Sequence, residues 1–225
     1  MGPEVSVWFT SDLHIGHRLC ATIRGFIPEC QSLPVNERRI ESGVVDHDSE
    51  LAGNWDAVVK PGDQVWVLGD ISAGGTAAQL SALQWLSNRP GEKHLIAGNH
   101  DGVHPLHRNS HKWQPEYLKV FASVQTMARR KINGQNVLLS HFPYRGDHTD
   151  KDRYIQYRLR DEGLPLLHGH THSREKYRAG LIGHNGAIIF RDSPTIHVGV
   201  DAWDLRPVHL DVIAAALLDV GQMPH

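Results

Sequence analysis

Short apolar runs alternate with polar residues along the first half of the chain. Three runs, at residues 5–10, 64–68 and 93–97, are rich in valine, leucine and aromatic side chains and are too short to be helices. Each run is followed within two residues by an aspartate or an asparagine. We therefore predict three buried strands whose carboxyl ends carry polar side chains, at the edge where open α/β sheets bind ligands.

The segments between these strands have the spacing of amphipathic helices. After Pro34, apolar residues recur at near-helical intervals, at Ile40, Val44, Leu51, Trp55 and Val58. A second series follows Thr76 and is closed by Asn88, with apolar residues at Leu80, Leu83 and Leu86. The first half therefore reads as strand, helix, strand, helix, strand.

The second half of the chain changes to β-like runs. An Asn133-Gly134 turn between apolar runs at 129–132 and 135–140 predicts a β-hairpin. Further strands are expected at 121–127, 164–168, 187–190 and 195–200, and a final helix at 209–218. An α/β half followed by a β-rich half predicts two packed sheets with helices outside them.

The composition limits the classes of protein to consider. A length of 225 residues without repeats or low-complexity runs predicts one domain, spanning residues 1–225. No apolar segment approaches the ~20 residues of a membrane span, and the first residues lack a signal-peptide pattern, so we expect a cytoplasmic protein. Cys20 and Cys30 are expected to be free thiols. The net charge of −2 argues against an extended nucleic-acid surface and favours a small substrate.

Five polar clusters stand out in this chain, which contains 17 histidines. They are Asp12-Leu13-His14, Gly69-Asp70, Gly98-Asn99-His100-Asp101, Ser140-His141 and Gly169-His170-Thr171-His172. In an extended chain the outer side chains of D-x-H or H-x-H leave the same face, so each pair could hold one metal ion. A lone D-x-H is as well explained by a helix cap beside a surface histidine, but two such pairs favour metal binding.

Asp70 has a special place in this set because it follows the apolar run at 64–68, and a buried carboxylate must be paired or bound to metal. Its two oxygens could bridge two cations ~3.5–4 Å apart, as in two-metal phosphoryl-transfer sites. Asn99 offers an amide oxygen, and His141 and His170 offer ring nitrogens. Such donors, with no thiolate among them, favour Mn, Fe, Zn or related ions over a structural zinc site.

The ordered set D-x-H, G-D, G-N-H-D, H and G-H-x-H resembles the motifs of the calcineurin-like metallophosphoesterases, and it extends from Asp12 to His172. Segments 11–17 and 198–208 resemble a subfamily of small bacterial and phage phosphoesterases, some of which cleave 2′,3′-cyclic nucleotides. The resemblance implies an α/β fold, a four-layer α/β-β/α sandwich with two mixed β-sheets flanked by helices in a single metallophosphoesterase domain. It also implies two divalent or trivalent transition-metal ions, with Mn expected in vitro and Fe, Zn, Ni or Co as alternatives.

The same resemblance implies a role for each cluster residue. The first ion would be held by Asp12, His14, Asp70 and His172, and the second by Asp70, Asn99, His141 and His170. His100 would be the catalytic general acid, and Asp101 would orient it. These roles suit the chemistry, because two cations exceed the charge of the ligand carboxylates, attract a phosphoester and lower the pKa of a bridging water toward ~7. His100 would then protonate the departing alkoxide.

Several other residues near the clusters lie outside these two ligand sets. Four could contact substrate or could be ordinary loop residues, namely His17, Arg18, Tyr144 and Arg145. Four histidines are expected to be exposed loop residues and not ligands, namely His104, His107, His111 and His148. His168 is expected to be a buried strand end or a partner of a ligand, and Asp201 to hydrogen-bond the site loops. Trp66, Trp85 and Trp113 are expected in the core.

We therefore predict a dinuclear metal-dependent phosphodiesterase that hydrolyses small phosphodiesters, with 2′,3′-cyclic nucleotides as the first choice. The alternatives are a phosphomonoesterase or a nucleic-acid end-processing phosphatase or nuclease and, from another class, a non-catalytic metal-stabilised scaffold that binds proteins. The presence of His100 argues against a scaffold, because a scaffold needs no catalytic acid and another residue could take its place there. The expected partner is a small phosphoester and not a membrane, and the sequence leaves the oligomeric state open.

Overall fold

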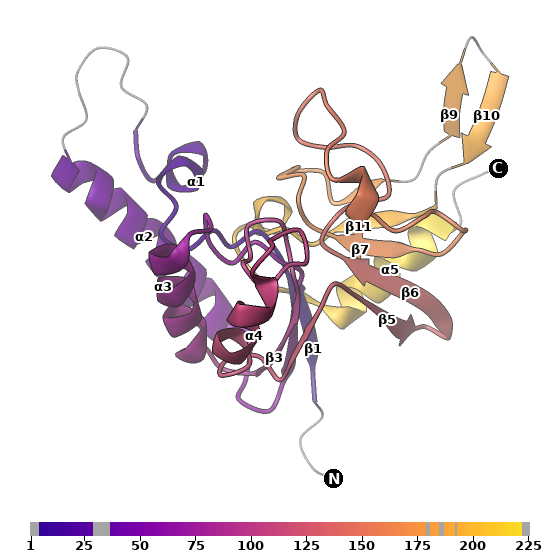
Figure 1. Ribbon diagram of the computed structural model, residues 1–225. Helices are drawn as coiled ribbons and strands as arrows, with labels where there is room; N and C mark the ends of the chain where they lie inside the picture. The colour runs from indigo at the N-terminus through magenta and orange to yellow at the C-terminus, as the bar shows by residue number, and fades with distance from the viewer. Residues whose placement is uncertain (1–4, 29–36, 179–180, 185–186, 192, 222–225) are drawn as a thin grey trace.

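The computed structural model of the protein describes residues 5–28, 37–178, 181–184, 187–191 and 193–221 (Figure 1). Cys30, expected to be a free thiol, and Pro34, expected to precede a helix, lie outside the described residues. The described chain forms two five-stranded mixed sheets and a separate two-stranded sheet. Helices flank the two larger sheets.

The first sheet has the strand order β12-β1-β2-β3-β4. Four strands run parallel, namely β1 (Val7–Thr10), β2 (Gln64–Val67), β3 (Glu92–Ile96) and β4 (Ser123–Gln125). At one edge, β12 (Val208–His209) pairs antiparallel with β1. Because β1, β2 and β3 are parallel neighbours, the polar clusters that follow them lie at the same edge of the sheet.

Three helices cover one face of the first sheet, on the side away from the second sheet (Figure 1). They are α2 (Glu37–Asp56), α3 (Thr76–Ser87) and α4 (Ser110–Tyr117). Trp55, Leu86 and Tyr117 of these helices share one buried cluster with Val65 and Leu95 of the sheet. Alternate strand residues point to opposite faces, so the other face of the sheet supplies a second core.

The second sheet has the order β5-β6-β7-β11-β8. β5 (Met127–Ile132) and β6 (Gln135–Ser140) form the predicted hairpin, with positive φ at Asn133 and Gly134. β7 (Leu166–His168) pairs in parallel with β11 (Thr195–His197), and β8 (Tyr177–Arg178) forms the edge. The separate pair consists of β9 (Leu181–His184) and β10 (Ala187–Arg191).

A second buried cluster joins the two sheets. Phe9, Trp66 and Ile96 from the first sheet pack in one cluster with Leu167 and Ile196 from the second. The C-terminal helix α5 (Leu210–Gly221) contributes apolar side chains to the same cluster. This packing brings the loops after the first sheet's strands against those after β6 and β7, so residues far apart in sequence meet.

The predicted α/β fold class, with two mixed β-sheets flanked by helices, is confirmed. The sequence pattern missed the six-residue α1 (Arg18–Ile23) and also α4, which contains the helix-disfavouring Pro115. The first long helix ends at Asp56, so the predicted inclusion of Val58 was wrong, and Pro61 and Gly62 follow soon after. Two 3-10 helices complete the elements, η1 (Ile155–Tyr157) and η2 (Val200–Ala202). Within the described chain, no helix is both long and apolar enough to cross a membrane.

Candidate metal centre

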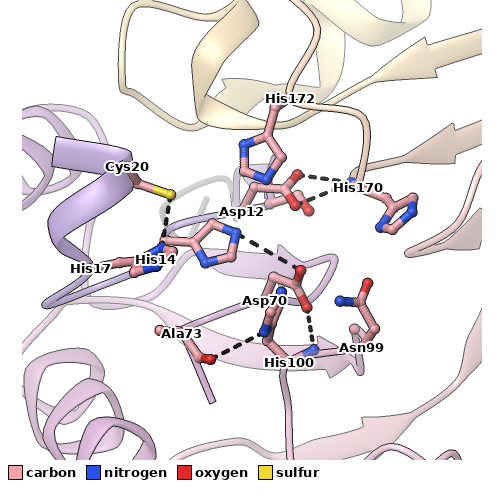
Figure 2. Close-up of polar contacts among 12 residues, drawn as sticks. Asp12, His14, His17, Cys20, Asp70, Ala73, Asn99, His100, His170 and His172 are labelled. Atoms are coloured by element: carbon pink, nitrogen blue, oxygen red, sulfur yellow. Dashed lines mark hydrogen bonds and ion pairs between the residues drawn. The ribbon is translucent and has the colours of Figure 1, made fainter. Parts of the chain in front are cut away.

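The residues predicted as metal ligands converge where the loops of the two sheets meet (Figure 2). The ligand atoms of Asp12, His14 and His172 lie within 4.8 Å of one another. A second group, Asp70, His141 and His170, satisfies the same limit. These two groups correspond to the two ions implied by the motifs, and the chain brings them together from four separate loops, which follow β1, β2, β6 and β7.

Asp70 belongs to the second group and also approaches the first. Its Oδ2 atom lies 3.8 Å from Nε2 of His14 in the first group and 3.4 Å from Nε2 of His141 in the second. Asn99 joins the second group, with its Oδ1 atom 3.1 Å from Nε2 of His141. The arrangement therefore suits a carboxylate that bridges two cations.

Five of the predicted ligands have a left-handed backbone. The φ angles are 56° at Asp12, 49° at His14, 55° at Asp70, 69° at His170 and 49° at His172. These segments are therefore not extended, the condition under which the two side chains of D-x-H would share a face, and the side chains converge through left-handed turns instead. Such a conformation costs about 1–3 kcal/mol for each residue other than glycine and is typical of functional sites.

The imidazole nitrogens are arranged for metal binding. Nδ1 of His14 donates to the Ser72 carbonyl at 3.1 Å, and Nδ1 of His141 donates to the Leu68 carbonyl at 2.7 Å. These bonds select the tautomers in which Nε2 carries a lone pair. Nε2 of His14 is buried without a hydrogen-bond partner in the described structure, and Nε2 of His170 is buried with the Asp147 carboxylate 3.2 Å away. A buried, unpartnered nitrogen beside carboxylates fits a metal site, so the residues present suit the ions implied by the motifs.

Electrostatics within the centre couple the carboxylates to the histidines. Burial alone would raise the pKa of Asp70, but the adjacent His141 and His14 lower it well below its usual range. Burial would lower the pKa of His141, yet the charge and hydrogen bond of Asp70 raise it to about 9. For His170, burial and then the charge of His141 lower the pKa to about 3, and the hydrogen bond and charge of Asp147 offset only part of this. His141 therefore carries a proton, and a positive charge, next to Asp70 in the metal-free protein. A bound cation would displace this proton and replace its positive charge.

Asp101 does not orient His100, which corrects the sequence interpretation. Its buried carboxylate accepts backbone N–H bonds from Asp70 at 2.9 Å, Ile71 at 3.1 Å and Gly98 at 2.7 Å. Burial, followed by the charge of Asp70, raises the pKa of Asp101 to about 7. The chain turns so that neighbours in sequence point apart, and Asp101 ties together the loops after β2 and β3.

The Ala73 carbonyl orients the His100 ring instead. Nδ1 of His100 donates to this oxygen at 3.1 Å, while the backbone N–H of His100 donates to Asp70 Oδ1 at 2.8 Å (Figure 2). The Nδ1 bond leaves Nε2 available to exchange a proton. A cavity of about 360 Å³ adjoins His100, lined also by Asn99 and Trp113.

His172 is oriented by a carboxylate from the C-terminal part of the chain. Nδ1 of His172 donates to Asp201 Oδ2 at 3.1 Å, and Asp201 is itself held by the Arg24 guanidinium. Burial would raise the pKa of Asp201, but the hydrogen bonds from Arg24 and His172 hold it well below its usual range. The predicted hydrogen bond from Asp201 to the site loops is therefore confirmed.

The comparisons with known proteins agree with this geometry. Residues 5–174 match the family model of the calcineurin-like phosphoesterases. The chain belongs to this family. Membership implies hydrolysis of phosphoesters with divalent metal ions, and the two ligand groups are the candidate sites for them.

Two phage proteins and one solved structure resemble this calcineurin-like phosphoesterase. The gene 66 protein of Mycobacterium phage L5 is 45% identical over 210 residues, which cover 88% of this chain and 87% of that protein. The gene 66 protein of Mycobacterium phage D29 is 48% identical over 213 residues, which cover 90% and 92%. The protein of unknown function AQ665 from Aquifex aeolicus aligns with a TM-score of 0.60 and 19% identity, covering 95% of this chain and 100% of that one, which shows a shared fold.

The substrate-contact candidates of this phosphoesterase occupy different places. The His17 ring lies 5.3 Å from the His14 ring and its Nδ1 is 3.0 Å from Cys20 Sγ, so His17 borders the centre. Arg18 is exposed at the start of α1. Tyr144 and Arg145 line a second cavity, of about 330 Å³.

Cys20 is a free, buried thiol, as predicted.

The other histidines divide into confirmed and corrected predictions. His104 is only 3% exposed, and His107 is half-buried with Nε2 2.9 Å from the Asn99 carbonyl, so their expected exposure was wrong. The aromatic rings around His104 and the approach of residue 107 to a ligand loop explain this burial. His111 and His148 are exposed, as predicted, although His111 lies in α4 and not in a loop. His168 is the buried last residue of β7, as predicted.

The tryptophan predictions hold, and three functional candidates were missed. Trp66 is buried, and Trp85 and Trp113 are partly buried against the core.

The missed residues are Arg24, Asp147 and His197. Asp147 Oδ2 lies 3.2 Å from His170 Nε2, and His197 Nε2 lies 3.9 Å from Asp12 Oδ2. No motif or spacing marks these three residues, because their partners are remote in sequence.

Proposed function

We propose that this protein is a dinuclear metal-dependent phosphodiesterase that hydrolyses small phosphodiesters, with 2′,3′-cyclic nucleotides as the favoured substrates. The position of Asp70 carries the proposal: it belongs to the second ligand group and also approaches His14 of the first, which suits a pair of cations that share one carboxylate. A cytoplasmic location belongs to the same proposal.

In this proposal, the first metal site consists of Asp12, His14, Asp70 and His172, and the second of Asp70, Asn99, His141 and His170. When bound, the two cations supply Lewis acidity that activates a water for attack on phosphorus and offsets charge on the phosphoryl oxygens. Mn²⁺ is the first choice in vitro, with Fe, Zn, Ni or Co as alternatives, because all suit nitrogen and oxygen donors.

His100 is the proposed general acid. The Ala73 carbonyl fixes its Nδ1–H, so Nε2 is the atom that would give a proton to the departing alkoxide. The cavity lined by His100 offers room for a leaving group. A positioned acid supports an enzyme over a metal-stabilised scaffold, which needs none.

A turnover panel with Mn²⁺ tests the proposal. Bis-p-nitrophenyl phosphate and 2′,3′-cAMP should be hydrolysed faster than p-nitrophenyl phosphate, 3′,5′-cAMP and single-stranded DNA. Hydrolysis of the monoester alone would replace the diesterase proposal with a phosphomonoesterase. Degradation of DNA alone would favour an end-processing nuclease, and a lack of turnover with two bound metals would favour a scaffold.

A further inference from the structure

A cavity of about 330 Å³ adjoins the metal centre on the side of the second sheet. Thr171, which lies between two predicted ligands in sequence, is part of its lining. Asp147 lines it and approaches His170 to 3.2 Å, and His197 lines it and approaches Asp12 to 3.9 Å. A substrate held at the metals would therefore have its organic substituent next to this cavity.

The His197 side chain lines the cavity and is buried without hydrogen-bond partners for its ring among the described residues. It is 3% exposed, and neither ring nitrogen has a hydrogen-bond partner in the described structure. Its backbone is fixed on both sides, because its N–H donates to the Lys176 carbonyl and its carbonyl accepts from Trp203 Nε1. An unsatisfied buried imidazole calls for a partner with hydroxyl or amide groups, which offer both donors and acceptors.

The cavity wall provides flat surfaces in addition to hydrogen-bonding groups. Tyr144 donates its hydroxyl to the Leu164 carbonyl, so its ring is the part available to a ligand. Tyr177 and Arg178 of β8 also line the cavity. Aromatic rings and guanidinium planes are the side chains on which nucleobases stack.

The charge of the lining favours a ligand that carries phosphate. Lys176 and Arg178 contribute positive charge, against the acids Asp147 and Glu175. Asp147 is already neutralised by ion pairs with arginines outside the lining. The lining therefore retains positive charge next to the centre where the phosphoester would bind.

We infer that this cavity is a subsite for the nucleoside part of a phosphodiester, with the base against Tyr144 or Tyr177 and a hydroxyl or amide group on His197. This inference rests on the proposed function and adds to it the place where the nucleoside would bind. A volume of about 330 Å³ falls in the range of small-molecule pockets. His197 is thereby assigned to substrate specificity, and it is not a metal ligand.

Adenosine is the probe, because it lacks the phosphate that the metals would hold. Isothermal titration of adenosine into the Mn²⁺-loaded full chain should show saturable binding. His197→Phe, which removes both ring nitrogens at similar size, should weaken that binding about tenfold or more. Metal content measured on the same samples shows whether the change near Asp12 has disturbed the centre.

A blocked cavity provides the second test. Ser173 lines the cavity, whereas the neighbouring Arg174 is exposed and does not, so Ser173→Trp and Arg174→Trp place the same bulk one residue apart. The ratio of kcat/KM for 2′,3′-cAMP to that for methyl p-nitrophenyl phosphate should fall about tenfold or more in Ser173→Trp alone. The methyl diester reports on the metal centre, because its retained group is too small to fill the cavity.

The outcomes separate the subsite from the proposed function. Hydrolysis of the methyl diester without adenosine binding, or an unchanged ratio in Ser173→Trp, would overturn the subsite and leave the diesterase intact. Adenosine binding that His197→Phe abolishes, in a protein that hydrolyses no diester, would support the subsite and reject the diesterase.

Discussion

Arg24 binds Asp201 through two hydrogen bonds, from Nε to Oδ1 at 2.8 Å and from Nη2 to Oδ2 at 2.9 Å. The same guanidinium donates to the backbone carbonyls of Asp12 at 2.7 Å and Leu13 at 3.1 Å. One arginine therefore supports the left-handed turn at Asp12 and the carboxylate that orients His172. Residues that touch no metal thus determine the geometry of the first ligand group.

Asp201→Asn tests this support. The amide can no longer accept charge-assisted bonds from both Arg24 and His172, so the affinity for the first metal ion should fall about 10–100-fold. Titration of Mn²⁺ into chelator-treated protein measures the change. Asp211→Asn, at an exposed position of α5, is the matched control and should bind like the wild type. Equal affinities for the two variants would mean that Asp201 has no part in metal binding.

Asp70→Ala tests the bridging role. Because the Asp70 carboxylate lies between both ligand groups, its loss should empty both sites and not one. Metal content by inductively coupled plasma mass spectrometry should fall from two ions per chain to near zero, while circular dichroism verifies folding. Retention of two ions in a folded variant would contradict the bridging assignment.

His100→Ala separates proton transfer from metal binding. Turnover of diesters with poor leaving groups should fall about 10²–10⁴-fold, and p-nitrophenolate, which leaves without a proton, should be affected far less. Metal content should stay at the wild-type value, since Ala73 and not a metal holds the ring. His111→Ala, at an exposed histidine of α4, controls for loss of an imidazole. Loss of metal in His100→Ala would identify His100 as a ligand.

The sequence predicted the strands that carry the clusters, because strand ends and motif order can be recognised from local sequence. All seven candidate ligands converge in the folded chain. The left-handed turns were missed because the spacing of two residues was interpreted for an extended chain. In the folded chain the segments after β1 and β2 continue side by side beyond the strands, and the Asp12 N–H donates to the Gly69 carbonyl. Asp101 was misassigned because adjacency in sequence does not imply contact. Arg24 and His197 were missed because only the folded chain places them beside Asp201 and Asp12.

Gly98→Ala tests how tightly the loops after β2 and β3 pack. A Cβ at residue 98 would lie 2.3 Å from Asp70 Oδ1 and 2.7 Å from Asp70 N, so the bridging carboxylate would have to move. We expect loss of metal binding together with a drop of about 1–3 kcal/mol in the free energy of unfolding. Gly62→Ala has no atom within 4 Å of the added carbon and is the control. Wild-type metal affinity in Gly98→Ala would show that the loop can relax.

His168 predicts how stability depends on pH in the metal-free protein. Burial lowers its pKa to about 4, below the ordinary value of 6.5, so the unfolded chain binds a proton that the folded chain excludes between these values. The free energy of unfolding should therefore decrease as pH falls from 6.5 to 4, by about 3 kcal/mol for this residue. Urea unfolding with chelator present, repeated across this range, should give a shallower slope for His168→Gln than for the wild type. The exposed His111→Gln should keep the wild-type slope, and identical slopes for the two variants would show that His168 is protonated without unfolding.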